Sequence, residues 1–225
     1  AVEFVAVAQV NRRDPAPRAG AGTQAAAWWQ EVRTAPRVFS WRQPFRWRQW
    51  PDSTMPLSAS PPAVVLVHGF FCNRGFWLPW MKRLHALGVP FVSVNLEPIF
   101  GSIDDYASIV DDAVTRATRL TGHAPTLICH SMGGLVARSA IASAYRQQHA
   151  WVERLDRIVF LGTPHHGAPL ERAGHALQTL GLPADRIDSP LPDAAQFDSE
   201  HLWPVVRAQA APGRRILVVR GRTVG

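Results

Sequence analysis

The sequence predicts an α/β fold in which a mostly parallel sheet is covered by helices on both faces. Short apolar segments rich in β-branched residues, such as 63–67, are typical of strands buried on both sides. These segments alternate along the chain with longer segments of helical periodicity. That alternation favours a doubly wound sheet, because parallel neighbours need a crossover connection.

The predicted strands and helices follow one another from residue 61 on. The clearest helix is Ile103–Leu120, where apolar residues recur every three or four positions and Asp104 and Asp105 occupy the first turn. After residue 167 the pattern becomes weaker, and a final strand is predicted near the end. In chain order the elements are a strand at 64–67, a helix around 76–87, a strand at 91–94, the helix at 103–120, a strand at 126–129, a helix at 132–145, and strands at 157–161 and 215–220.

Residues 1–60 are predicted to form an N-terminal extension to a domain that spans residues 61–225. The extension comprises a linker at 11–23, a short helix at 24–33 and a segment, Pro36–Trp50, that interleaves tryptophan and phenylalanine with arginine. Its aromatics alternate with period two, which predicts an antiparallel edge hairpin around Gln43 and Pro44. Two interpretations stay open. Either the segment contacts a membrane surface, or it packs its aromatics on the sheet and exposes its arginines, which we favour.

Composition narrows the class of protein. The chain has 225 residues, enough for one domain with a sizeable core, and a formal net charge of +7 carried almost wholly by arginine. A basic surface suits anionic membranes or nucleic acid. The sequence holds no nucleic-acid-binding signature, so we expect no nucleic-acid partner. No stretch reaches the roughly 18 apolar residues that a membrane-spanning helix needs.

Cysteines and histidines give no sign of a metal or cofactor. The only cysteines, Cys72 and Cys129, are too few for a disulfide framework or a metal cluster, and we expect two small buried thiols. The adjacent His165 and His166 point in different directions, and no pair of residues has the spacing of a zinc motif.

A serine lies between small residues at the end of a predicted strand. The segment 126–129 is apolar, Ser131 follows it, and a helical pattern begins at Met132. This context is typical of a nucleophile elbow, in which a sharp turn lifts a serine hydroxyl above the sheet edge; an ordinary turn before a helix is the other interpretation. Gly133 relieves crowding on the helix side, whereas Cys129 replaces the usual strand-side glycine.

The loop after the first predicted strand supplies a second element of the candidate site. It follows Val67 at the carboxyl end of the strand, where parallel sheets place their ligands. In acyl-transfer enzymes such a loop donates one backbone N–H to the oxyanion, and the residue after the nucleophile donates another. We therefore expect the amides of Phe70 and Met132 to form an oxyanion hole. The residues expected to shape the site around them are His68, Gly69, His130 and Gly133.

Three motifs resemble signatures of bacterial lipases in the α/β-hydrolase superfamily: Val67–Gly69, Cys129–Gly134 and Leu161–Gly167. The resemblance covers about residues 60–170. It implies a serine hydrolase of carboxylic esters in lipid metabolism, a lipase or esterase, with an acyl ester or lipid as substrate and a helical lid over residues 168–211. The superfamily also contains thioesterases and acyltransferases, and either reaction would use the same serine.

The general base and its carboxylate are not evident. A triad needs a histidine oriented by a carboxylate, and in the superfamily both follow the nucleophile, beyond the strand resembling 215–220. No histidine follows His201. Three explanations stay open. In the first, the natural protein continues past Gly225 with its last strand, helix and triad residues. Alternatively, the site is rewired, with His201 as base and Asp193 or Asp198 as acid, or the chain is a hydrolase-like scaffold that binds acyl ligands or a partner without catalysis.

The start of the chain suggests a further hypothesis. Ala1 is not a methionine, and residues 1–10 are apolar and precede Asn11-Arg12-Arg13. We therefore expect the chain to begin inside a longer protein, after a membrane segment or a cleaved leader. The compartment itself is not determined by the sequence, although membrane association is one outcome of this hypothesis.

Overall fold

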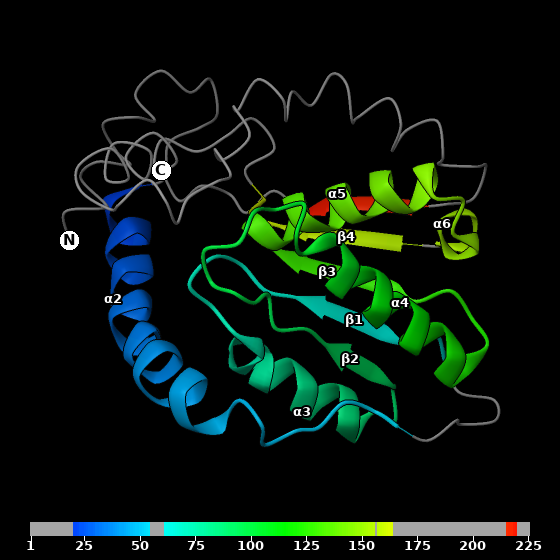
Figure 1. Ribbon diagram of the computed structural model, residues 1–225. Coiled ribbons are helices and arrows are strands. Elements are labelled where there is room, and N and C mark those ends of the chain that lie inside the picture. Colours follow the sequence, from blue (N-terminus) through cyan, green and yellow to red (C-terminus); the bar gives the residue numbers. More distant parts are fainter. Residues whose placement is uncertain (1–19, 55–60, 156, 164–214, 220–225) are drawn as a thin grey trace.

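The computed structural model describes residues 20–54, 61–155, 157–163 and 215–219. At its centre is a five-stranded parallel sheet with the strand order β2-β1-β3-β4-β5, which confirms the predicted α/β architecture (Figure 1). The strands are β1 (Val64–Val67), β2 (Phe91–Ser93), β3 (Thr126–His130), β4 (Arg157–Leu161) and β5 (Arg215–Val219).

The strand order changes direction at β1. From β1 the chain moves outward to β2 and then returns to the other side of β1 as β3. The loops that leave β1 and β3 therefore separate to opposite faces, and ligands of open α/β sheets bind at such a switch point. Val67 pairs with Cys129, so the two loops leave the sheet at the same level.

Helices cover both faces of the sheet, because the strands are apolar on both. On one face, α4 (Ala107–Thr121) and α5 (Met132–Arg146) pack on side chains such as Val65, Cys129 and Phe160. On the other face, α3 (Leu78–Ala86) and the 3-10 helix η3 (Arg74–Trp77) pack on Val64 and Leu66. The short α6 (Ala150–Arg154) lies beside the amino end of β4, opposite the arrowheads in Figure 1.

Helix α4 begins later than the sequence predicts. Its first residue is Ala107, and residues 103–106 form turns instead of the expected first helical turn. Asp105 accepts a hydrogen bond from the Ser102 N–H at 3.0 Å and donates its own N–H to the Ser102 hydroxyl at 3.2 Å. This reciprocal pairing offers the backbone an alternative to the helix, so the acidic residues precede α4.

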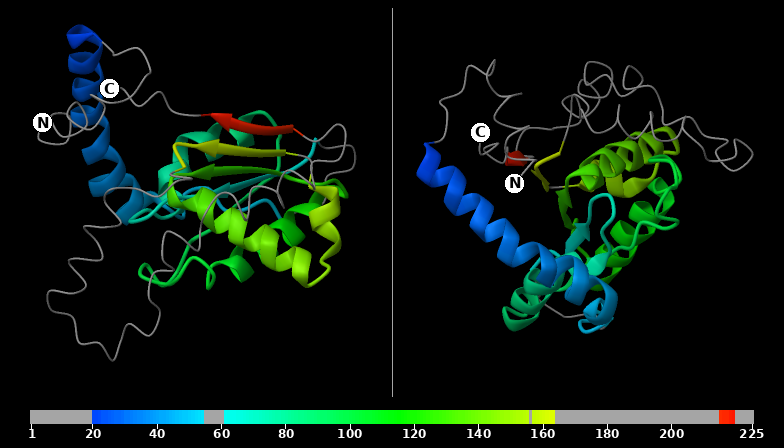
Figure 2. Two further views of the ribbon diagram at one scale, coloured as in Figure 1. Left: turned by 90° about the horizontal axis from the view of Figure 1, so that it is seen from above. Right: turned by 90° about the vertical axis from the view of Figure 1, so that its left-hand side faces the viewer.

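The predicted hairpin at 36–50 is wrong. Helix α2 (Ala21–Arg37) continues into η2 (Val38–Arg46), a π-helical segment. Phe39, Trp41 and Phe45, which we expected to pack on the sheet, are 51%, 55% and 68% exposed. Helix α2 itself contains no buried residue and runs across the carboxyl ends of the strands (Figure 2).

The segment after η2 packs along β2. Ser53 donates its N–H to the Phe91 carbonyl oxygen at 3.0 Å, and its hydroxyl accepts the Phe91 N–H at 3.1 Å. Asp52 forms ion pairs with Arg74 at 2.7 Å and with Arg116 at 3.1 Å. These contacts cross the boundary predicted at residues 60 and 61.

Candidate active site

Ser131 occupies a sharp turn between a strand and a helix. Strand β3 ends at His130, α5 begins at Met132, and Ser131 between them has φ 51° and ψ −128°. A positive φ is strained for a residue with a Cβ and is characteristic of functional turns. The Ser131 N–H donates to the Leu161 carbonyl oxygen at 2.9 Å, and the Ser131 carbonyl oxygen accepts the Gly134 N–H at 3.0 Å. Both sides of the strained residue are thereby fixed.

Two glycines permit this turn to lie against the loop after β1. A Cβ on Gly133 would meet the His68 carbonyl oxygen at 2.4 Å and the Val67 carbonyl oxygen at 2.7 Å. A Cβ on Gly69 would lie 2.9 Å from the Ser131 Cβ. Cβ contacts below 3.0 Å essentially never occur, and neither a backbone oxygen nor the Cβ of Ser131 can move easily, so both positions favour glycine.

The loop after β1 turns immediately beside the serine. The Cys72 N–H donates to the Gly69 carbonyl oxygen at 3.3 Å, and Phe71 has a φ of 52°. Within the described residues, neither the Phe70 N–H nor the Met132 N–H donates a hydrogen bond. Met132 is also the first residue of α5, where the helix dipole favours negative charge. Among the described residues, both amides are thus without an acceptor.

His68 holds this loop and is not available as a base. Its ring is 1% exposed; Nδ1 donates to the Gly69 carbonyl oxygen at 2.9 Å, and Nε2 accepts the Leu96 N–H at 3.1 Å. Since both ring nitrogens are engaged, the neutral tautomer with a proton on Nδ1 is fixed. Burial lowers the pKa of His68 to about 4, which keeps the ring neutral.

His130 lies next to the serine in sequence but packs elsewhere. Its ring stacks on Phe76, with the centroids 4.4 Å apart and the planes inclined by 22°. Burial lowers its pKa. Its Nδ1 has no hydrogen-bond partner in the described part of the chain. His130 thus fills the space between β3 and η3 as a neutral ring.

The remaining described histidines lie away from Ser131. His149 precedes α6, at the amino end of the sheet, where it pairs with Asp111 at 2.7 Å. His123 follows α4 at the same end, and His85 on α3 contacts Trp50. The other histidines of the chain, His201 among them, lie outside the described residues, as do Asp193, Asp198, His165, His166 and the segment 168–211 expected to form a lid.

Three exposed phenylalanines form a rim beside the candidate oxyanion loop. Phe70, Phe71 and Phe100 are 43%, 61% and 77% exposed. Their ring centroids lie 4.3 Å apart between Phe70 and Phe71 and 5.6 Å apart between Phe71 and Phe100. Phe100 was not expected at the site from the sequence, although its neighbours Pro98 and Gly101 mark a turn after β2.

Gln43 is a second neighbour of this loop that was not expected from the sequence. Gln43 is buried and contacts Asn73, three residues after Phe70. The incorrect hairpin prediction gave no reason to expect Gln43 to be buried, because a single glutamine in an aromatic-rich segment does not indicate a contact.

The described residues include no group of three or more His, Cys, Asp or Glu side chains that could hold a metal ion. Both cysteines are free thiols: Cys129 is buried and Cys72 half-buried. Burial raises the pKa of both thiols, so neither is an activated nucleophile.

Comparisons with known proteins agree with this architecture. A family model described as the PGAP1-like alpha/beta domain matches residues 100–181. The mature form of the Bacillus licheniformis lipase BlEst2 is 18% identical with a TM-score of 0.50, and the match covers 74% of this chain and 68% of that one. No curated protein matches the sequence.

Other solved structures are less similar. The Paleococcus ferrophilus monoacylglycerol lipase is 17% identical with a TM-score of 0.39, covering 72% of this chain and 73% of that one. The RedJ thioesterase of Streptomyces coelicolor is 22% identical with a TM-score of 0.37, covering 73% and 66%. The match to BlEst2, at 18% identity and a TM-score of 0.50, supports the fold alone.

Proposed function

We propose that this chain, a member of the α/β-hydrolase superfamily, hydrolyses carboxylic esters through an acyl-enzyme formed on Ser131. The observation that carries the proposal is the backbone of Ser131, held at φ 51° between β3 and α5 with two glycines packed against the turn. Strain of this kind costs about 1–3 kcal/mol and persists where function requires it.

The reaction begins with attack of the Ser131 Oγ on the ester carbonyl carbon. The hydroxyl proton passes to a histidine, and the carbonyl oxygen becomes an oxyanion that accepts hydrogen bonds from the Phe70 and Met132 amides. The tetrahedral intermediate then collapses, and the alcohol leaves with the proton from the histidine. Water, deprotonated by the same histidine, attacks the acyl-enzyme and releases the carboxylic acid and the free serine.

The base belongs to the part of the chain or protein outside the described residues. His68 is locked with both nitrogens engaged, and His149 lies at the opposite end of the sheet. His201 with Asp193 or Asp198, or groups beyond Gly225, are the candidates. A base must come within about 3 Å of the serine oxygen, directly or through one water.

The rim of Phe70, Phe71 and Phe100 supports a substrate that carries an apolar acyl group. An exposed aromatic cluster beside the oxyanion loop offers surface for hydrocarbon to bury. The lipase BlEst2, which shares the fold, is named for activity on lipid esters, in agreement with this substrate class.

The test combines an active-site probe with ester turnover. A fluorophosphonate probe should label the wild type and not Ser131→Ala, and p-nitrophenyl butyrate hydrolysis should fall at least about 1,000-fold. The matched control is Ser108→Ala, since Ser108 is exposed on α4. Labelling without turnover would show that the serine is activated and would place the defect in the choice of ester or in deacylation. Faster cleavage of a matched acyl thioester would assign a thioesterase instead, and neither labelling nor turnover would favour a binding scaffold.

A further inference from the structure

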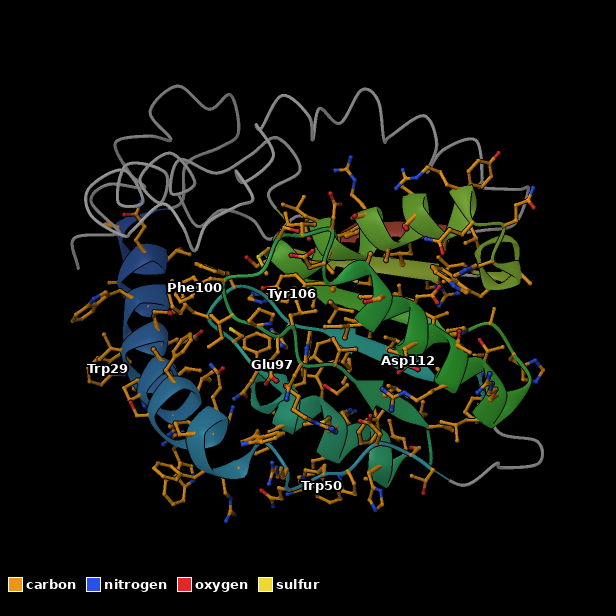
Figure 3. All side chains as sticks on the ribbon, in the orientation of Figure 1. Trp29, Trp50, Glu97, Phe100, Tyr106 and Asp112 are labelled. Atoms are coloured by element: carbon orange, nitrogen blue, oxygen red, sulfur yellow. The ribbon has the colours of Figure 1, made fainter. Side chains whose placement is uncertain are left out.

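Helix α2 and η2 expose a set of large apolar side chains that do not pack into the core. Trp29, Trp41 and Phe45 are 54%, 55% and 68% exposed. Trp41 and Phe45 contact each other, with ring centroids 5.6 Å apart, and in Figure 3 Trp29 points away from the sheet. We call this the aromatic–arginine surface; its exposed apolar members are Trp28, Trp29, Val32, Phe39, Trp41 and Phe45.

The same segment is strongly basic. Between residues 20 and 50 it carries five arginines and one carboxylate, Glu31, a net charge of +4. Two arginines lie over its tryptophans: Arg46 over Trp41 at 5.8 Å and Arg48 over Trp47 at 4.3 Å. These cation–π contacts hold each guanidinium group next to an indole ring.

The aromatic–arginine surface lies on the same side of the molecule as the candidate site. Helix α2 stands in front of the carboxyl ends of the strands in Figures 1 and 2, and Ser131 follows the carboxyl end of β3. Among the described residues, no helix is long and apolar enough to cross a membrane.

We propose that the aromatic–arginine surface docks this chain on the surface of a bilayer that contains anionic lipids. Tryptophan settles at the level of the lipid headgroups, because its ring is apolar and its N–H is polar. Arginine binds lipid phosphate with paired hydrogen bonds. A basic face with exposed aromatics therefore fits an anionic bilayer in both charge and polarity.

Charge also argues against a second copy of this chain as the occupant. Two such surfaces facing each other would bring two segments of charge +4 together, and like charges at an interface are unfavourable. The docked orientation brings the rim of Phe70, Phe71 and Phe100 and the Ser131 side of the sheet toward the lipid. The docking itself does not depend on the chemistry of Ser131.

The experiment measures flotation of the full chain with vesicles of phosphatidylcholine alone or mixed 3:1 with phosphatidylglycerol. The wild type and Ser131→Ala should bind the anionic vesicles equally, and at least about tenfold more tightly than the neutral ones. Binding should fall at least about tenfold in 1 M NaCl. Brominated acyl chains should quench the wild-type tryptophan fluorescence, a measurement that needs no substitution.

Matched variants locate the surface. Arg37→Gln/Arg46→Gln/Arg48→Gln should lower vesicle partitioning about 10- to 100-fold. Its control removes three exposed arginines from other helices: Arg83→Gln/Arg119→Gln/Arg146→Gln. That control should change binding less than about threefold.

A second pair of variants tests the aromatics. Trp41→Ser/Phe45→Ser should lower binding at least about tenfold, whereas Leu87→Ser/Tyr145→Ser, with residues 63% and 57% exposed on the body of the molecule, should not. The proposal would be overturned by an equal loss of vesicle binding in a variant and its control, or by equal binding to neutral and anionic vesicles. It would also be overturned by a dimer in solution that Trp41→Ser/Phe45→Ser dissociates. The variants should keep wild-type hydrolysis of a water-soluble ester, so a failure of docking is distinguishable from a failure of catalysis.

Discussion

The side-chain oxygen of Gln43 accepts a hydrogen bond from the Asn73 N–H at 2.7 Å, and the Gln43 carbonyl oxygen accepts another from the Asn73 side chain at 3.0 Å. Gln43 belongs to η2, whereas Asn73 ends the loop that carries the Phe70 amide. Gly75, two residues after Asn73, lies so close to η2 that an added Cβ would meet the Arg42 carbonyl oxygen at 2.8 Å. The N-terminal extension therefore holds the candidate oxyanion loop in place.

Replacing Gln43 tests this relationship. Gln43→Ala leaves the Asn73 N–H without its partner, so we expect a loss of about 1–3 kcal/mol in unfolding free energy. We also expect kcat for p-nitrophenyl butyrate to fall about tenfold with KM nearly unchanged, because the loop would lose its position in the transition state. The control is Gln49→Ala, since Gln49 is exposed. Equal kinetics for the two variants would contradict the positioning role.

The strain at Ser131 predicts a difference in stability between two substitutions. Ser131→Gly removes the Cβ that makes φ 51° unfavourable, whereas Ser131→Ala keeps it. We expect the glycine variant to be more stable than the alanine variant by about 1 kcal/mol, after the greater chain entropy of unfolded glycine is subtracted. Chemical denaturation measures the difference, and an alanine variant equal to or more stable than the glycine variant would argue against a strained turn.

Gly133 and Gly22 should respond in opposite ways to the same substitution. A Cβ on Gly133 would meet backbone oxygen at 2.4 Å, so Gly133→Ala should push α5 away from the loop after β1 and cost at least about 2 kcal/mol. Gly22 lies in α2 with nothing within 4 Å of the added Cβ, so Gly22→Ala should stabilise the helix by about 0.5–1 kcal/mol. Thermal melts of the two variants test the contrast.

His68 predicts loss of stability in acid. Its pKa is about 4 in the folded chain, below the unfolded value near 6.5. Between these values the unfolded chain binds the proton and the folded chain does not, so unfolding free energy falls as the pH drops from about 6.5 to 4. The loss attributable to His68 is at most about 3 kcal/mol.

A comparison with His68→Asn isolates that contribution. His130, whose pKa burial also lowers, contributes to acid sensitivity in the wild type and the variant alike. The variant should be less stable at pH 7, because its amide cannot make both hydrogen bonds of the ring. Its unfolding free energy should depend less on pH between 4 and 6.5, and identical pH profiles would exclude His68 as the source.

Histidines at the amino end of the sheet should not affect turnover. His149→Ala removes the 2.7 Å contact with Asp111 and should lower stability modestly, by about 1 kcal/mol, since the pair is partly exposed. Its kcat/KM for a short ester should stay within about twofold of wild type, as should that of His123→Ala. A large kinetic loss in either variant would mean that the base has been misplaced.

Elements with a strong local pattern were predictable from the sequence. Strand β1 is buried along its whole length, and β3 and β4 are short apolar runs with one fully buried face. Such runs have few alternatives to a strand of a parallel sheet. The turn at Ser131 was recognisable because its glycine spacing reflects a steric requirement.

Elements decided by distant contacts were not predictable. The alternation of aromatic residues at 39–47 is typical of a strand, but the segment is helical. Its buried residues are Val38 and Gln43, and Gln43 contacts Asn73, which is thirty residues away in the sequence. The start of α4 depends on the pairing of Ser102 with Asp105, which competes with helix formation. The base could not be identified, because a triad is recognised by the geometry of residues far apart in sequence, and His201, Asp193 and Asp198 lie outside the described residues.

The ion pairs of Asp52 affect where a shorter expressed fragment of this protein should begin. A gene fragment started at residue 61 would leave Arg74 without the carboxylate beside it, and it would also strip the Ser53 backbone from the outer edge of β2. Unsatisfied polar groups there would invite precipitation or pairing between molecules along the freed strand. The shortest stable fragment of this chain should accordingly start upstream of Val38, so that η2 remains packed against the loop after β1.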